Sequence, residues 1–147
     1  MKKLVAFALT AGSIAVLCYP TRGEGSRTEP THTVWDSVYT DSQTVRGDSI
    51  YKATCTRCHG PELKGGDDGS PLAGDPFFVG WEGKPLAGLY DQIRNSMPPE
   101  NPKSLSRSQV ADLVAYLLAQ NHFPAGHAAL SDDSGRLNDI KIVQKKP

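Results

Sequence analysis

The chain has 147 residues, with 16 basic and 16 acidic side chains and a formal net charge of zero. This length is that of one small domain. The basic cluster near the C-terminus, Lys141, Lys145 and Lys146, is interpreted as a solvated tail. A chain without a basic face is not expected to bind nucleic acid.

Residues 1–23 are typical of a secretory signal peptide, because a short basic start is followed by an apolar run over residues 4–17. That run is too short to span a bilayer, which needs about 20 residues. No stable membrane insertion is therefore expected after cleavage, and the remaining 13 basic and 16 acidic residues give a net charge of −3. We expect an exported, periplasmic protein. Lipidation of Cys18 and an uncleaved anchor are the alternatives.

Residues 24–41 are rich in Gly, Ser, Thr, Glu and Pro, and we expect them to form an extended lead-in to a compact domain at residues 42–123. The first predicted helix runs from about Ser42 towards Cys55. It contains Gly47, which costs about 1 kcal/mol relative to Ala inside a helix. We therefore expect a close crossing of two helices at this glycine, since a residue without Cβ lets them approach.

The most informative segment directly follows this helix and reads Cys55-Thr56-Arg57-Cys58-His59. Two cysteines at this spacing with a histidine directly after the second form the attachment pattern for c-type haem. On a helical turn the i, i+3 spacing brings both sulfurs to one face. The two thiols would bind one haem covalently, and His59 would supply the proximal iron ligand.

Two cysteines at this spacing also have other interpretations. A closed structural zinc site needs four ligands, and the remaining cysteine, Cys18, lies in the leader. A thioredoxin-like pair lies beside a βαβ unit, a pattern that the sequence lacks. A disulfide between Cys55 and Cys58 would close a tight loop. Haem attachment is favoured, with zinc, redox thiols and a disulfide as alternatives.

Two further helices are predicted in the compact domain. One opens at Pro85, which suits a first helical turn, and the other begins with a capping box of Ser106 and Gln109. Apolar residues recur in both at helical spacing. They are Leu86, Leu89, Tyr90 and Ile93 in the first, and Val110, Leu113, Val114, Leu117 and Leu118 in the second. Strand patterns are nearly absent, so an all-α fold of three to five helices is expected.

Residues 124–147 are predicted to form a C-terminal extension that packs on the domain. A turn over residues 132–135 precedes an extended segment with three apolar residues, Leu137, Ile140 and Ile142.

The order of helix, CxxCH, Gly-rich loop, short helix, Met-Pro and amphipathic last helix resembles a small class I (monohaem) cytochrome c over residues 42–123. The resemblance implies haem attachment outside the cytoplasm and a right-angled crossing of the first and last helices at the haem edge. Gly47, Tyr51 and Tyr116 match that contact. The segment from Leu72 to Pro99 is also similar to cytochrome domains associated with periplasmic quinoprotein dehydrogenases.

Met97 is the expected distal ligand, because the other methionine, Met1, is removed with the leader. Pro98 and Pro99 stop the helix and stiffen the loop that would hold the sulfur. Met/His ligation raises the reduction potential relative to two histidines. The competing histidines are His32, His122 and His127.

Leu72, Trp81 and Ile93 are predicted haem contacts, and the indole N–H of Trp81 is a candidate partner for a propionate. Other apolar residues are candidates for the same wall or for ordinary core. They are Phe77, Phe78, Leu86, Leu89 and Tyr90.

The expected function is electron transfer without catalysis, between a dehydrogenase donor and an oxidase or another cytochrome as acceptor. A dedicated subunit of a quinoprotein dehydrogenase or oxidase complex is the main alternative. A gas-binding or peroxidatic haem protein would require Met97 to be off the iron. A zinc or thiol module would contain no haem.

Overall fold

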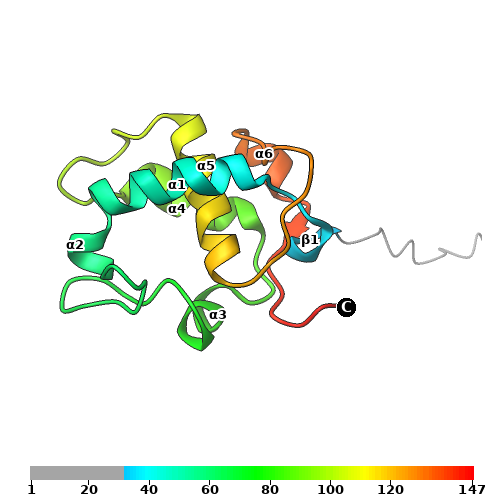
Figure 1. Cartoon of the computed structure of the whole chain (residues 1–147), viewed down its shortest axis with the longest axis horizontal. Helices are drawn as coiled ribbons and strands as arrows, with labels where there is room; N and C mark the ends of the chain where they lie inside the picture. Colours follow the sequence, from blue (N-terminus) through cyan, green and yellow to red (C-terminus); the bar gives the residue numbers. More distant parts are fainter. Residues whose placement is uncertain (1–31) are drawn as a thin grey trace, which may run out of the picture.

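Figure 1 shows the computed structural model, which describes residues 32–147. The predicted signal peptide with Cys18, and residues 24–31 of the predicted lead-in, lie outside the described residues. The elements follow in the order β1 (His32–Thr33), η1 (Val34–Asp36), α1 (Asp41–Thr54), α2 (Thr56–His59), α3 (Asp75–Trp81), α4 (Leu86–Ser96), α5 (Arg107–Gln120), α6 (Ser134–Leu137) and β2 (Ile140–Lys141). The all-α prediction is confirmed, because in residues 32–147 the helices are accompanied by a sheet of two short strands.

The main packing relationship is the crossing of α1 and α5, which Figure 1 shows running across each other. A Cβ at Gly47 would overlap the carbonyl oxygen of Asp112 and lie 2.7 Å from the Cβ of Tyr116. The rings of Tyr51 and Tyr116 lie 5.2 Å apart at the same crossing. The predicted role of Gly47 is therefore confirmed, since only glycine lets the two helices approach this closely.

An ion pair that the sequence did not predict also joins these helices. Arg46 of α1 donates from Nε and Nη2 to the two carboxylate oxygens of Asp112 of α5, at 2.7 and 2.8 Å. Asp112 is almost fully buried, and a bidentate guanidinium supplies the hydrogen bonds that a buried carboxylate requires. The pair thus fixes the register of α1 against α5 beside Gly47.

Both long helices begin with a capping box. Ser106 accepts a hydrogen bond from the N–H of Gln109 at 3.2 Å, and the side chain of Gln109 accepts from the N–H of Ser106 at 2.9 Å, as predicted. Thr40 and Gln43 form the same arrangement before α1. These reciprocal bonds satisfy backbone donors that the first helical turn leaves unpaired.

The sequence analysis did not predict η1, which lies within the expected extended lead-in, nor α3, α6 and the pairing of β1 with β2. The prediction of an extended conformation is wrong for Leu137, which ends α6. Asp133 accepts a hydrogen bond from the N–H of Gly135 at 3.0 Å and so begins a helical turn there. The extended part follows at Ile140–Lys141, which pairs in parallel with His32–Thr33.

The C-terminal extension contacts the helices at several points along its length. Gln43 of α1 bonds both backbone groups of Leu130, and Tyr90 of α4 donates its hydroxyl to the carbonyl of Asp132 at 2.8 Å. The side chains of Leu130, Leu137 and Ile142 are buried in the core. Among the described residues, no helix is long and apolar enough to cross a membrane.

Candidate functional site

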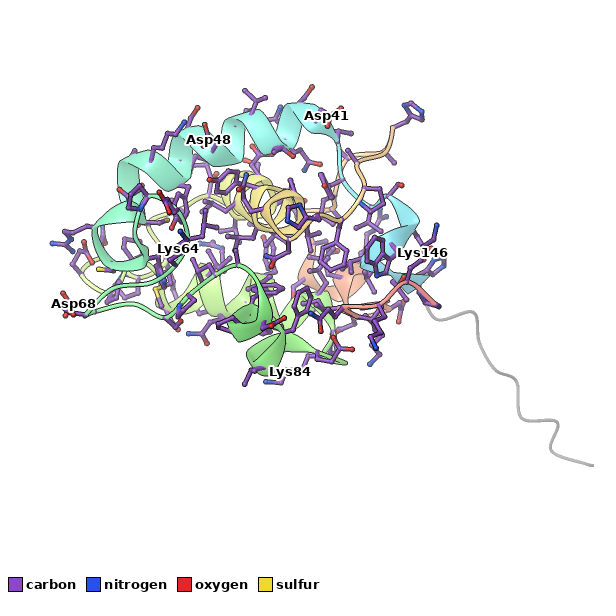
Figure 2. All side chains as sticks on the ribbon, turned by 60° about the horizontal axis from the view of Figure 1, so that its bottom comes forward. Asp41, Asp48, Lys64, Asp68, Lys84 and Lys146 are labelled. Carbon is purple, nitrogen blue, oxygen red and sulfur yellow. The ribbon has the colours of Figure 1, made fainter. Side chains whose placement is uncertain are left out.

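A cavity of about 430 Å³ opens beside α2, between α1, α4 and α5. All seven residues predicted to bind the cofactor or its iron line it: Cys55, Cys58, His59, Leu72, Trp81, Ile93 and Met97. The side-chain view in Figure 2 shows sulfur atoms gathered towards the end of the molecule marked by Asp68, which lines the same cavity. Residues far apart in the sequence therefore meet at one site.

Cys55 and Cys58 lie where α1 ends and α2 begins. Cys55 closes α1 by donating its N–H to the carbonyl of Tyr51 at 2.8 Å, and it also precedes the first residue of α2. Both thiols are half-buried, free and directed to the cavity, so the disulfide alternative is not what the structure contains. Burial, followed by the neighbouring Cys58, raises the pKa of the Cys55 thiol to about 11.

His59 is held by the glycine-rich loop that follows it. Its Nδ1 lies 2.7 Å from the carbonyl oxygen of Ser70, and a carbonyl only accepts, so Nδ1 is the protonated nitrogen. This bond fixes the ring and leaves Nε2 with a free lone pair, the form that binds a metal. A Cβ at Gly69 would lie 2.5 Å from the carbonyl oxygen of Cys58 and 3.0 Å from Nδ1 of His59. The loop therefore reaches the histidine because Gly69 has no side chain.

Met97 directly follows the last residue of α4 and caps this helix by donating its N–H to the carbonyl of Ile93 at 3.1 Å. Its backbone is extended, with φ −118° and ψ 143°, as expected for a residue before proline. Met97, Pro98 and Pro99 all line the cavity. The thioether of Met97 and the imidazole of His59 thus line the same cavity, the first from the loop that follows α4 and the second from α2.

The cavity walls are mainly apolar. Leu72, Trp81 and Ile93 come from three segments, and α5 contributes Leu113 and Leu117. Of the five apolar residues that were candidates for wall or core, only Leu89 lines the cavity. Phe77, Phe78, Leu86 and Tyr90 are buried in the core instead.

The helical repeat of α4 explains this division. Leu89 and Ile93 are four residues apart, so they lie on one face, towards the cavity. Tyr90 is rotated away from them and donates its hydroxyl to Asp132 of the extension. The apolar residues of α4 therefore divide between two surroundings. Leu89 and Ile93 face the cavity, whereas Tyr90 contacts the C-terminal extension.

Asn121, which caps the C-terminal end of α5, is a positioning residue that the sequence analysis did not identify. Its side chain accepts from the N–H of Gly74 at 3.0 Å and donates to the carbonyls of Leu72 and Leu117 at 3.0 and 2.8 Å. It is buried with every bond satisfied. The available indication in the sequence was an asparagine directly after an apolar helix, because a polar side chain that is buried at such a place must find partners.

The competing histidines lie outside the cavity. His32, His122 and His127 are exposed, and none is among the residues that line it. Within residues 32–147, no group of three or more His, Cys, Asp or Glu side chains is arranged to hold a metal ion.

The residues present fit a covalently attached haem. Two thiols one helical turn apart, an imidazole with its Nδ1 fixed, a thioether and apolar walls converge on one cavity. The space at Gly69 is also restricted, because any side chain there would displace His59 or the helix that holds the thiols. Cys55 and Cys58 would hold the haem, with His59 and Met97 available to its iron.

This all-α fold and this set of donors define a class I c-type cytochrome, a class whose haem c is covalently attached. The family model described as "Cytochrome C oxidase, cbb3-type, subunit III" matches residues 42–117, and the chain belongs to this family. No curated protein matches the sequence. The crystal structure of the sulfane dehydrogenase SoxCD from Paracoccus pantotrophus matches with a TM-score of 0.49 and 21% identity, covering 91% of this chain and 68% of that one.

Proposed function

We propose that this protein is a periplasmic electron carrier with one haem c, attached through Cys55 and Cys58 and ligated by His59 and Met97. The observation that carries the proposal is the convergence of two thiols, one imidazole and one thioether on a single apolar cavity. Transfer of electrons by a c-type haem is the role of the family. The proposal goes beyond the family assignment in three respects, which are the pair of iron ligands, the single haem and the periplasmic location.

When bound, haem c supplies an iron that gains and loses one electron. The protein residues set the conditions for that change. The bond from Nδ1 of His59 to Ser70 orients the imidazole and raises its basicity as a ligand. The prolines after Met97 hold the thioether without relying on a strong bond to iron. The apolar walls disfavour added charge and so favour the reduced form.

Ligation by both His59 and Met97 leaves no coordination position for a substrate. A protein with this ligand pair would change little between its oxidised and reduced states. These two properties support a carrier over an enzyme. They also separate this proposal from a gas-binding or peroxidatic haem protein, which requires an open position on iron.

The periplasmic location is proposed from residues 1–23, whose basic start and apolar run are typical of an export signal. Covalent attachment of haem to a CxxCH sequence outside the cytoplasm is implied by the cytochrome resemblance. A cell fractionation with a cytoplasmic marker tests it. Recovery of the haem-containing protein with the cytoplasmic marker would contradict the proposal.

A dedicated subunit of a larger oxidase or dehydrogenase is the second candidate. It is favoured by the family description, which names an oxidase subunit. The donor and acceptor are in either case proposed to be redox proteins. Co-purification of the untagged protein with one larger enzyme at fixed stoichiometry supports the subunit, whereas a free monomer that reduces several acceptors supports the carrier.

Attachment is tested by expressing the full chain in a host with a haem-attachment system. Mass spectrometry of the denatured protein should show one haem per chain, and Cys55→Ala with Cys58→Ala should lose it. Ser49→Ala, an exposed position on α1, is the control and should keep the haem. Carbon monoxide should not bind the reduced wild-type protein; rapid binding would favour the open-site alternative.

A further inference from the structure

Residues 140–144, called here the C-terminal strap, run along the segment between α3 and α4. The N–H of Gly83 donates to the carbonyl of Ile142 at 2.8 Å, and the N–H of Ile142 donates to the carbonyl of Lys84 at 3.0 Å. The side chain of Ile142 is completely buried. The strap therefore pairs with the α3–α4 connection through its backbone and is anchored by one apolar side chain.

Gln144 holds both ends of α3. Its backbone N–H donates to the carboxylate of Glu82, which follows the last residue of α3, at 2.8 Å. Its side-chain amide donates to the carboxylate of Asp75, the first residue of α3, at 3.0 Å. One residue of the strap thus spans the length of this short helix.

The strap is itself held from the other side. Trp35 donates its indole N–H to the carbonyl of Val143 at 3.0 Å, and β2 of the strap pairs in parallel with β1. In Figure 1 the C-terminal segment lies beside β1. The strap consequently joins the segment at residues 32–36 to α3, which lie far apart in the sequence.

Helix α3 depends on outside contacts because it has seven residues and its N-cap, Gly74, makes no side-chain cap bond. Isolated helices of this length are unstable in water. Phe77 and Phe78 fix its buried side, but its two exposed ends are bonded to Gln144. Its last residue, Trp81, lines the haem cavity, and the carbonyl of Trp81 accepts from the N–H of Lys84 in the connection that the strap pairs with.

We propose that the C-terminal strap is a positioning element for the Trp81 wall of the cavity, and that its attachment sets how much water reaches the haem. This rests on the proposed function and adds a means of regulating it. With the strap in place, Trp81 closes the apolar wall. Release of the strap would free both ends of α3, admit water and stabilise the oxidised, more highly charged form.

The test compares full-length, haem-containing variants. Ile142→Asp places a charge at a fully buried position and should release the strap. We expect the redox equilibrium constant to shift at least about threefold towards the oxidised form, which is roughly 30 mV for one electron. Amide hydrogen exchange over residues 75–85 should accelerate in the same variant.

Leu130→Asp is the matched control. Leu130 is a buried residue of the same extension, but its backbone bonds are to Gln43 of α1. It should lower the free energy of unfolding as well, while leaving the reduction potential and the exchange of residues 75–85 unchanged. An equal potential shift in both variants would overturn the proposal, because general destabilisation would then explain it.

If Ile142→Asp does not retain haem, Gln144→Ala decides the matter, since it removes only the exposed bond to Asp75. It should shift the redox equilibrium constant at least about twofold in the same direction and speed exchange at the start of α3, whereas Lys145→Ala should do neither. An unchanged reduction potential or unchanged hydrogen exchange in Gln144→Ala would overturn the proposed role of the strap and leave the proposed function intact. A wild-type protein without covalent haem would overturn the proposed function and the strap with it.

Discussion

Arg57 and Glu100 form an ion pair that joins α2 to the loop carrying Met97, with Nη2 and Oε1 2.5 Å apart. Arg57 lies between the two cysteines, and Glu100 follows Met97 by three residues. Both side chains are mostly exposed, at 73% and 54%. Ion pairs of this kind contribute at most about 1 kcal/mol, so the pair is a weak and salt-sensitive tie between the two sides of the site.

The first prediction is that Glu100→Gln lowers the free energy of unfolding by up to about 1 kcal/mol in low salt, and that the difference vanishes in 1 M salt, where charges are screened. Urea unfolding of the haem-containing protein at the two salt concentrations measures it. Arg57→Ala combined with Glu100→Gln should cost no more than Arg57→Ala alone. If Glu100→Gln still lowered the free energy of unfolding in 1 M salt, the contribution of Glu100 would not come from its charge.

The second prediction concerns the helix crossing. Gly47→Ala should destabilise the protein by at least about 1 kcal/mol, because the strain of overpacking is about 1–3 kcal/mol and exceeds the gain in helix propensity. Gly80→Ala is the control, since a Cβ there meets nothing within 4 Å. That change should be neutral or stabilising. Equal unfolding midpoints for the two variants would contradict the tight crossing.

The third prediction tests the loop that holds His59. Gly69→Ala should reduce the yield of haem-containing protein, because its Cβ would meet the carbonyl of Cys58 and the imidazole. Ser70→Ala should have no such effect, since the bond to His59 comes from the backbone carbonyl and survives the change. The measurement is the ratio of haem absorbance to protein in the purified variants. Normal haem content in Gly69→Ala would show that the loop has more room than the structure indicates.

The fourth prediction is a loss of stability at alkaline pH. Burial, followed by the charges of Cys55 and Tyr116, raises the pKa of Tyr51 from 10.0 to about 12, and its hydroxyl donates to the carbonyl of Gly60 at 2.6 Å. The neutral phenol is thus favoured in the folded state, so its contribution is complete below pH 10. It is lost as pH rises from 10 through 12, because the unfolded chain releases the proton first.

Tyr51→Phe is the variant that isolates this effect. It should cost about 1 kcal/mol at neutral pH for the lost hydrogen bond, and its stability should decline less between pH 10 and pH 12 than that of the wild type. Equilibrium unfolding followed across this range gives the comparison. Parallel curves for the two proteins would remove Tyr51 from the alkaline transition.

The parts of the site that could be predicted are those encoded in local sequence. Spacing or residue type alone indicates the role of three features, which are the CxxCH segment, the methionine before two prolines and the glycine inside the first helix. Gly47 was informative because a glycine inside a helix lowers its stability and so indicates a close contact at that position. The structure shows this contact with Tyr116. The capping box at Ser106 was likewise visible because its two partners are three residues apart.

The parts that could not be predicted depend on contacts between distant segments. Asn121 acts on Leu72 across 49 residues, and Gln144 acts on Asp75 across 69. Nothing near either residue in the sequence indicates its partner. Phe77 and Phe78 were ambiguous for a related reason, since an apolar residue in this fold can face the core or the cavity and its local sequence is the same in both cases.

The central proposal is that His59 and Met97 would both ligate the iron of one haem held by Cys55 and Cys58. The most direct measurement is the absorption spectrum of the oxidised, haem-containing protein, compared between the wild type, Met97→Ala and Ile93→Ala. The account predicts a c-type spectrum with a methionine–iron charge-transfer band in the wild type and in Ile93→Ala, and its loss in Met97→Ala. A band that survives in Met97→Ala, or that is absent from the wild type, would contradict the account.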